Sequence, residues 1–240
     1  FVTKNFGIGL YSRNSIDAKM NVDGTSMKTY LLDDVAMFLG YNFSLFDGRI
    51  KLGVVEKFIS RIEIDKDIDP TGPMDRGSHS SEGAAIGTDV GLMLTAPWIL
   101  LPTITAVARD VGGSNFTNGS GLRLNTTTRP TKLEQDLDVA IAIFPIHTSN
   151  TRSSFSVQYN QMTKAGLATD KNRFYHVGYE LNIADLLFLR AGMNQRYWTA
   201  GFEFASERIQ LQLTSYGEDI GADGAPEEDR RYIMKVAFRF

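Results

Sequence analysis

The chain has 240 residues, a formal net charge of −3 and a sequence pI near 5.7, so it lacks the basic character typical of a nucleic-acid-binding protein. It contains no cysteine, which excludes disulfides, thiolate metal sites and a cysteine nucleophile. No segment approaches the roughly 18 consecutive apolar residues of a membrane helix, but the strands of a membrane barrel need only about 9 to 11 alternating residues each.

The chain opens on FVTKNFGIGL, without an initiator Met, a charged leader or a small-residue cleavage site. We expect either that a signal peptide has been removed or that the true start lies upstream.

Apolar residues recur at every second position through most of the chain, which is the period of a β-strand. The pattern predicts an all-β protein. In chain order the thirteen candidate strands are 5–13, 15–22, 31–45, 48–62, 84–96, 101–111, 136–146, 153–162, 173–183, 187–194, 197–204, 208–216 and 231–240.

The connections between these strands alternate between short and long, with an exception near 195–196. Bacterial outer-membrane barrels have short periplasmic turns and longer extracellular loops, so this rhythm favours an antiparallel transmembrane β-barrel over a soluble sandwich. We expect residues 1–240 to form a single barrel domain. The glycine-, serine- and threonine-rich stretch 112–128 is expected to be a flexible outer loop.

The rhythm also predicts an orientation. The last strand follows the long connection 217–230, so it runs towards the periplasm and places the C-terminus on that side. By the same count residues 5–13 descend, which implies one further N-terminal strand. We therefore expect 14 strands, or 12 if two of the weaker candidates merge.

The closing segment RYIMKVAFRF has one apolar and one largely cationic face. Such a strand is suited to lipid on one side and a wet interior on the other. Its apolar residues resemble the C-terminal signal read by the barrel assembly machinery: Tyr232, Met234, Val236, Phe238 and Phe240.

The opposite side of the alternating strands provides the candidates for a barrel lumen. They are Lys51, Asp89, Asp138, Phe144, His176, Glu180, Phe188, Arg190, Glu203, Arg231 and Lys235. A turn at 184–186 would place Glu180 directly opposite Arg190 on consecutive strands. An ion pair that fixes the strand register is the simpler interpretation, and a role facing a substrate is the alternative.

One residue conflicts with this pattern. Glu56 falls on the lipid-facing side of its strand, where a charge near the membrane midplane is destabilising. Either a bulge near Val54 and Val55 shifts the alternation, or Glu56 lies beyond the hydrocarbon.

No motif indicates an enzyme. The segment Asn118-Gly119-Ser120-Gly121 lacks the spacing of a nucleophile elbow, and His79, His147 and His176 lack metal-binding spacing. The chain is therefore expected to be neither an enzyme nor a cofactor-binding protein.

An acidic run suggests calcium only superficially. Asp65, Asp67 and Asp69 alternate along the chain, but an EF-hand needs Gly and Glu where Pro70 and Arg76 stand. A solvated outer loop is the simpler interpretation, and loose calcium binding by a loop is the alternative.

Several stretches resemble the FadL superfamily of outer-membrane barrels, above all its small PorV-like and TraF-like members. They are RIKLGVVEKFISR, GTDVGLML, LPTITAVARDVG and HVGYELNIADLLFLRAGM, of which residues 178–192 are the most specific. The resemblance implies a 14-stranded barrel that moves hydrophobic molecules in the transporter branch or serves a secretion complex in the PorV-like branch. The N-terminal hatch of the transporters, with its asparagine-proline-alanine motif, does not occur here, so its transport residues have no counterpart.

Three hypotheses follow. The first is an integral outer-membrane barrel that passes small hydrophobic molecules, and the second is a non-transporting PorV-like subunit of an envelope protein complex. Both have outer-membrane lipid and the assembly machinery as partners. The third is a soluble β-sandwich that acts as a binding module.

Overall fold

The structure is a computed structural model that describes residues 1–22, 24–72, 76–117 and 122–238. Most of these residues lie in β-strands, which confirms the prediction of an all-β chain. The strands are β1 (Phe6–Met20), β2 (Met27–Leu45), β3 (Ile50–Ile68), β4 (Ser81–Thr95), β5 (Thr103–Arg109), β6 (Asp136–Ile143), β7 (Ile146–Thr148), β8 (Thr151–Tyr159), β9 (Tyr175–Ile183), β10 (Leu187–Asn194), β11 (Tyr197–Ala205), β12 (Ile209–Asp219) and β13 (Glu228–Phe238).

Helical structure is confined to short connections. The described residues contain α1 (Arg76–His79), α2 (Met162–Leu167) and the 3-10 helix η1 (Lys171–Phe174). No helix in this part of the chain is long and apolar enough to cross a membrane.

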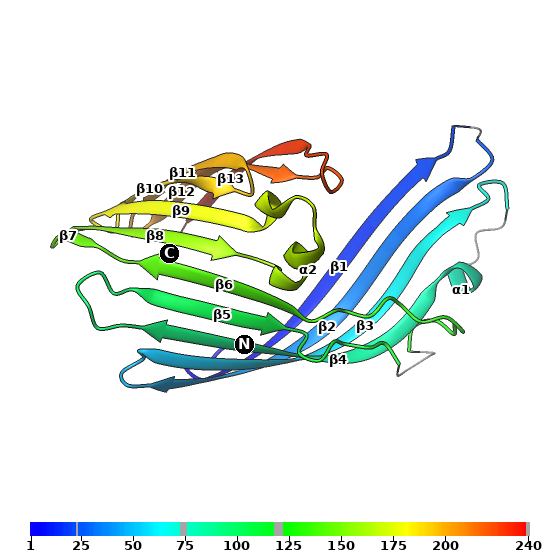
Figure 1. Ribbon diagram of the computed structural model, residues 1–240, viewed down its shortest axis with the longest axis horizontal. Coiled ribbons are helices and arrows are strands. Elements are labelled where there is room, and N and C mark those ends of the chain that lie inside the picture. The colour runs from blue at the N-terminus through cyan, green and yellow to red at the C-terminus, as the bar shows by residue number, and fades with distance from the viewer. Residues whose placement is uncertain (23, 73–75, 118–121, 239–240) are drawn as a thin grey trace. The chain divides into compact units, whose positions relative to one another are not determined.

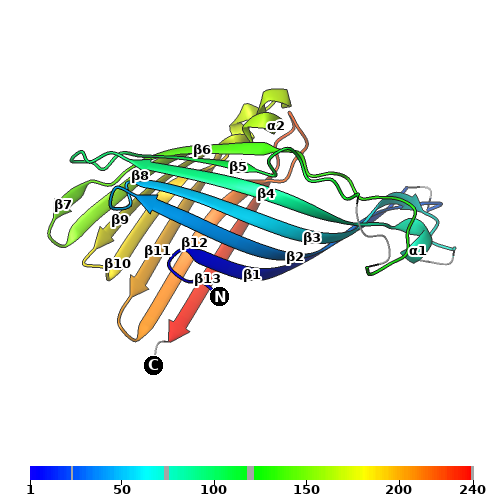
Figure 2. The same cartoon turned by 90° about the horizontal axis from the view of Figure 1, so that it is seen from below.

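The described strands form one sheet in which neighbours in sequence are neighbours in space. Its order is β1-β2-β3-β4-β5-β6-β8-β9-β10-β11-β12-β13, and the short β7 pairs only with β8. Figure 1 shows β5, β6, β8 and β9 side by side, and Figure 2 shows β10 to β13 continuing in order. Such a meander of antiparallel neighbours needs only local connections.

The chain is divided into two compact units. Unit 1 comprises Phe1–Phe43, Leu52–Val90 and Ala108–Gln135, and unit 2 comprises Ser44–Lys51, Gly91–Val107 and Asp136–Phe240.

A continuous β1 corrects the predicted turn at residues 13–15. Arg13, Asn14 and Ser15 lie opposite Asp34, Asp33 and Leu32 of β2, in unbroken register. The polar residues Arg13 to Ser15 interrupt the apolar pattern, but extended backbone with a neighbouring strand satisfies its hydrogen bonds without a turn. The two predicted strands 5–13 and 15–22 are therefore one.

The rhythm of the connections persists with this correction. We number the connections in chain order, starting with the one between β1 and β2, and treat the segment between β6 and β8 as one connection. Each odd-numbered connection is then longer than its neighbours, except 195–196. The sheet order has twelve strands among the described residues once β7 is set aside. The merger thus removes the reason for adding an N-terminal strand, while the strand number of a barrel and the closure of the sheet stay predictions.

Unit 1 has a small apolar core that depends on the β5–β6 connection. Phe116 is 2% exposed and packs against Ala36 of β2, Ile59 of β3 and Ala85 of β4. On β4 a Cβ added to Gly83 would lie 2.8 Å from Phe116, so glycine there leaves room for the connection.

Hydrogen bonds fix the same connection. Ser114 and Leu133 exchange backbone hydrogen bonds of 2.8 and 3.0 Å. Arg123 donates to the carbonyls of Asp33 and Ser60 at 2.7 and 2.9 Å. The described residues 112–117 and 122–128 belong to a connection outside the named strands and helices, as predicted, and Phe116 and Arg123 attach this connection to the strands.

Candidate functional site

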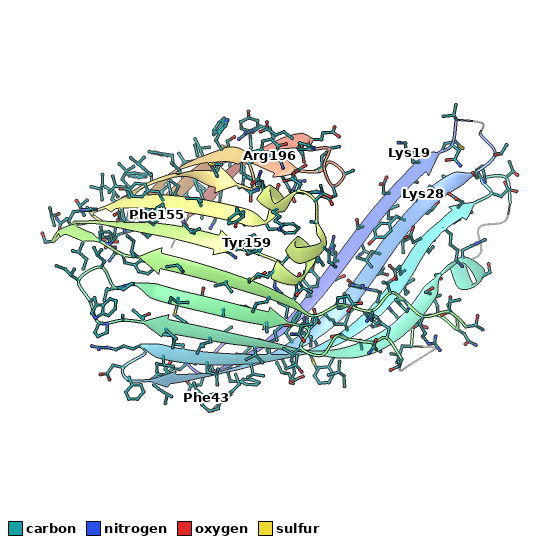
Figure 3. All side chains as sticks on the ribbon, in the orientation of Figure 1. Lys19, Lys28, Phe43, Phe155, Tyr159 and Arg196 are labelled. Carbon is teal, nitrogen blue, oxygen red and sulfur yellow. The ribbon has the colours of Figure 1, made fainter. Side chains whose placement is uncertain are left out.

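The two sides of the sheet in unit 2 differ in chemistry. Ser154 of β8 lies opposite Glu180 of β9, which lies opposite Arg190 of β10. On the other side Phe155 lies opposite Tyr179. We name the side with Ser154, Glu180 and Arg190 the polar face and the side with Phe155 and Tyr179 the apolar face; Figure 3 labels Phe155 on β8.

Burial in unit 2 is the reverse of that in a soluble protein, which buries apolar side chains. Every buried side chain among its described residues is polar: Thr103, Asp136, Asp138, Ser153, Asn182, Glu203 and Asp219. Large apolar residues on the apolar face are exposed instead, and these include Phe155, Tyr179, Leu189, Phe202, Leu213 and Met234.

An ion cluster on the polar face contains the predicted pair. Arg190 Nε lies 2.6 Å from Glu180 Oε2, which confirms the predicted pairing of these two residues. Arg190 Nη1 also lies 2.7 Å from Glu203 Oε2 on β11. Gly201 is the residue opposite Arg190 on β11, and a Cβ there would lie 3.3 Å from Arg190 Cβ. Glycine therefore leaves space for Arg190 to join Glu180 and Glu203.

The alternation of the sequence predicted Glu203 for the same side but not its contact with Arg190. Phe188 completes the surroundings of the cluster, because the Arg190 guanidinium lies 5.5 Å from the centre of its ring. The cluster is thus a fixed charged group, held in place by its own salt bridges and by an aromatic ring.

An apolar cavity of about 290 Å³ adjoins this cluster. Leu101 and Phe144, from connections between strands, and Ile146, the first residue of β7, line it together with Glu180 and Asn182. The Phe144 N–H donates to Leu100 O at 2.8 Å, which ties the two turns together. An apolar cavity with a few polar groups is the usual form of a small-molecule site.

Two further lumen candidates in unit 2 make local hydrogen bonds. His176 Nδ1 lies 2.6 Å from Asn194 Oδ1, and the Asp138 carboxylate accepts from the Gln161 N–H at 2.8 Å.

The remaining candidates are not brought into the Arg190 cluster. Arg231 pairs with Glu218 and Asp229 at 2.6 and 2.7 Å, and Lys51 and Lys235 are exposed. These contacts organise the strand ends rather than a common site.

Asp89 belongs to a cluster in unit 1 that the sequence analysis missed. Lys57, which is 8% exposed, lies 2.7 Å from Asp89 and 2.8 Å from Asp110. Ser114 Oγ donates to Asp110 at 2.9 Å. Lys57 therefore attaches the β5–β6 connection to the sheet. In the sequence, the one sign of its position is that it shares its face of β3 with Ile59 and not with Glu56.

The conflicting Glu56 has a partner on the neighbouring strand. Thr88 Oγ1 lies 3.0 Å from both carboxylate oxygens of Glu56. β3 runs unbroken through Val54 and Val55. A hydroxyl donor therefore compensates part of the cost of this carboxylate among apolar neighbours.

The closing strand exposes its alternate apolar residues. Tyr232, Met234, Val236 and Phe238 are between 48% and 78% exposed, and Phe240 lies outside the described residues. An exposed apolar row of this kind suits contact with another apolar phase.

The acidic run does not form a calcium loop. Asp65 and Asp67 are exposed on β3, whereas Asp69 accepts hydrogen bonds from the hydroxyl and the N–H of Thr71 at 2.7 and 2.8 Å. These bonds lower the pKa of Asp69. Across the described ranges, no group of three or more His, Asp or Glu residues is placed to hold a metal ion.

The other motifs remain separate. The segment 118–121 lies outside the described residues. His147 Nε2 lies 2.8 Å from Ser153 Oγ, and His79 belongs to α1.

Comparison with known proteins gives no further assignment. No protein-family model matches the chain, and no curated protein matches its sequence.

Proposed function

We propose that the chain is an integral β-barrel of the bacterial outer membrane, similar to the FadL superfamily, that passes small hydrophobic molecules across this membrane. The observation that carries the proposal is the reversed burial of unit 2. Its exposed face is apolar and its buried side chains are polar, the arrangement expected where hydrocarbon replaces water outside the sheet.

The edges of the sheet support closure. β1 and β13 end the strand order, so each has one partner in the described sheet. An open edge in a membrane would leave backbone groups without hydrogen bonds, and a closed barrel removes that cost.

Passage of a hydrophobic molecule is supported by the cavity beside the ion cluster. Its apolar lining of Leu101, Phe144 and Ile146 suits hydrocarbon, and Glu180 and Asn182 supply polar groups at its wall. The molecules that fit about 290 Å³ are small, such as an aromatic hydrocarbon or a short fatty acid.

The uptake of such a molecule into liposomes tests the proposal. We expect liposomes that contain the protein to take up an aromatic hydrocarbon faster than empty liposomes. Ser154→Trp should slow uptake because the indole occupies the cavity, which Ser154 lines. Val157→Trp is the matched control, because Val157 lies on the apolar face of the same strand, opposite Val177. Equal uptake by protein-containing and empty liposomes would contradict the proposal.

The second candidate function is that of a non-transporting, PorV-like subunit of an envelope complex. It is favoured by the β5–β6 connection, which packs Phe116 into the core of unit 1 and is tied down by Lys57. We infer that in a barrel this connection occupies part of the interior. Such a barrel serves as a support for partner proteins rather than as a passage. Recovery of a stoichiometric protein partner from gently solubilised membranes, together with no uptake, would favour this function.

A carbonate wash of membranes separates both functions from a soluble sandwich. We expect the protein to stay in the membrane pellet, and its release into the supernatant would favour a soluble binding module.

A further inference from the structure

A second cavity of unit 2 differs from the first in chemistry. It encloses about 440 Å³, and its lining residues come from α2, η1, the start of β9 and the adjacent connections. Its lining includes Gln161, Lys164, Arg173, Phe174, His176 and Gln195. Amides, cations and one aromatic ring predominate beside a single carboxylate, Asp223, which is unsuited to a hydrocarbon.

Hydrogen bonds at the back of this cavity orient its side chains. Asn194 Nδ2 donates to Gly217 O at 2.7 Å, so Asn194 Oδ1 must accept from His176 Nδ1. His176 Nε2 is then an acceptor when the ring is neutral. Gln195 Oε1 accepts from the Asp219 N–H, which leaves the Gln195 amide N–H groups as donors.

The nearby carboxylates are already occupied. Both oxygens of Asp223 accept backbone N–H groups, from Thr169 at 2.8 Å and Asp170 at 2.9 Å. Asp219 accepts from the N–H groups of Gly221 and Glu227 at 3.0 and 3.1 Å. Asp170 pairs with Arg196, which Figure 3 labels. Asp223 and Asp170 are therefore engaged within the protein, and the buried Asp219 Oδ2 lies 3.5 and 3.8 Å from Arg173 and Arg196.

The two cations differ in how far the protein uses them. Arg173 is held by Asp219, because Nη2 donates to Asp219 O at 3.2 Å and Nε lies 3.5 Å from Asp219 Oδ2. Lys164 makes no ion pair within the described part of the chain and lies exposed on α2. The lining thus carries two cations, Lys164 and Arg173, against one carboxylate, Asp223, and with the Gln195 amide it offers more donors than acceptors, which suits an oxyanion.

We propose that this cavity binds a phosphate or carboxylate carried on a small hydroxylated molecule. Lys164 and Arg173 hold the oxyanion, while His176 Nε2 and the Gln195 amide bind hydroxyl groups. The volume exceeds what a bare phosphate needs and falls in the range of small-molecule sites. The same chemistry is found in a free sugar phosphate and in the glycerol phosphate headgroup of a lipid.

Calorimetry on the full chain in neutral detergent tests whether the cavity binds a free sugar phosphate. We expect glucose 6-phosphate to bind and glucose not to bind. Lys164→Glu should weaken binding on the order of tenfold or more, since it replaces a charge-assisted contact by a repulsion. Lys171→Glu is the matched control, because this exposed lysine of η1 is not part of the lining and undergoes the same change of charge.

Native mass spectrometry from nanodiscs tests the lipid source. We expect retention of phosphatidylglycerol over phosphatidylcholine to be lost in Lys164→Glu and kept in Lys171→Glu if the ligand is a headgroup. Lys164-dependent binding in either arm supports the proposal. Equal binding of glucose and glucose 6-phosphate, or no difference between the two variants in both arms, would overturn it.

This proposal goes beyond the passage of hydrophobic molecules and does not require it. Uptake of an aromatic hydrocarbon by the Lys164→Glu variant distinguishes the phosphate-binding proposal from the proposed passage of hydrophobic molecules. Normal uptake with lost phosphate binding supports separate sites, and failure of uptake in the wild-type protein leaves the binding result unaffected.

Discussion

Single residues in unit 2 owe their importance to the face on which they lie. Both glutamates bind Arg190, but they differ in exposure. Glu203 is 8% exposed as a whole residue, whereas the side chain of Glu180 is 35% exposed. A buried charged group that loses its partner costs far more than an exposed one, because water replaces the lost contact only at the surface. We therefore expect the salt bridge of Arg190 with Glu203 to contribute more to stability than its salt bridge with Glu180.

We predict that Glu203→Ala lowers the free energy of unfolding by about 1–3 kcal/mol, because it removes the more buried partner of Arg190. Glu180→Ala should cost less than about 1 kcal/mol, since solvent screens this pair. Urea unfolding in detergent micelles measures both. Equal losses would show that burial does not distinguish the two partners.

Elements in unit 1 are joined by a connection that behaves as part of the core. β4 presents Gly83, Ala85 and Gly87 on one side, and these small residues leave space for Phe116 and Ser114. Lys57 and Arg123 then attach the same connection to the strands. Packing and hydrogen bonds together make the connection a fixed element.

We predict that Phe116→Ala destabilises unit 1 by about 3–5 kcal/mol, the usual cost of removing a buried phenyl ring. The variant should also be cleaved faster by trypsin after Arg123, whose guanidinium group donates to backbone carbonyls in the wild-type protein. Phe58→Ala on β3 is the control, because Phe58 is 39% exposed and its loss should change cleavage little. Unchanged cleavage of Phe116→Ala would mean that the connection is held without its aromatic anchor.

For the molecule as a whole, the decisive question is whether the apolar face contacts water or lipid. Exposed rows such as Leu189, Phe202 and Leu213 lie opposite one another on β10, β11 and β12. Water around such a surface is unfavourable, and lipid chains remove this cost. Membrane residence is therefore the proposal on which both candidate functions depend.

Spin labels in a reconstituted membrane check this proposal. Labels at Leu189 and Phe202 should collide readily with lipid-soluble oxygen and poorly with a water-soluble nickel complex. Labels at Ser156 and Gln212 on the polar face should show the reverse preference, because their neighbours across the strands are Gly178 and Glu203. The same accessibility at all four positions would contradict a membrane-facing sheet.

The strand character of the chain and one contact of the candidate site could be predicted from local sequence patterns. The period of two is a local property, so it predicts β-strands without knowledge of their partners. The Glu180–Arg190 pair was also predictable, because a tight turn at 184–186 fixes the register of two adjacent strands. Even the continuity of β1 had a signal: Phe6, Ile8, Leu10, Ile16, Ala18 and Met20 keep one parity across the expected turn.

Contacts between residues that lie far apart in the sequence could not be predicted in this way. Lys57 contacts Asp110, and Phe116 packs on Ile59, across long stretches of sequence. The oxyanion cavity likewise joins Lys164, His176 and Gln195 from separate elements. Alternation assigns a side chain to a face, but contacts across a long connection depend on how that connection folds back, and no local pattern encodes this.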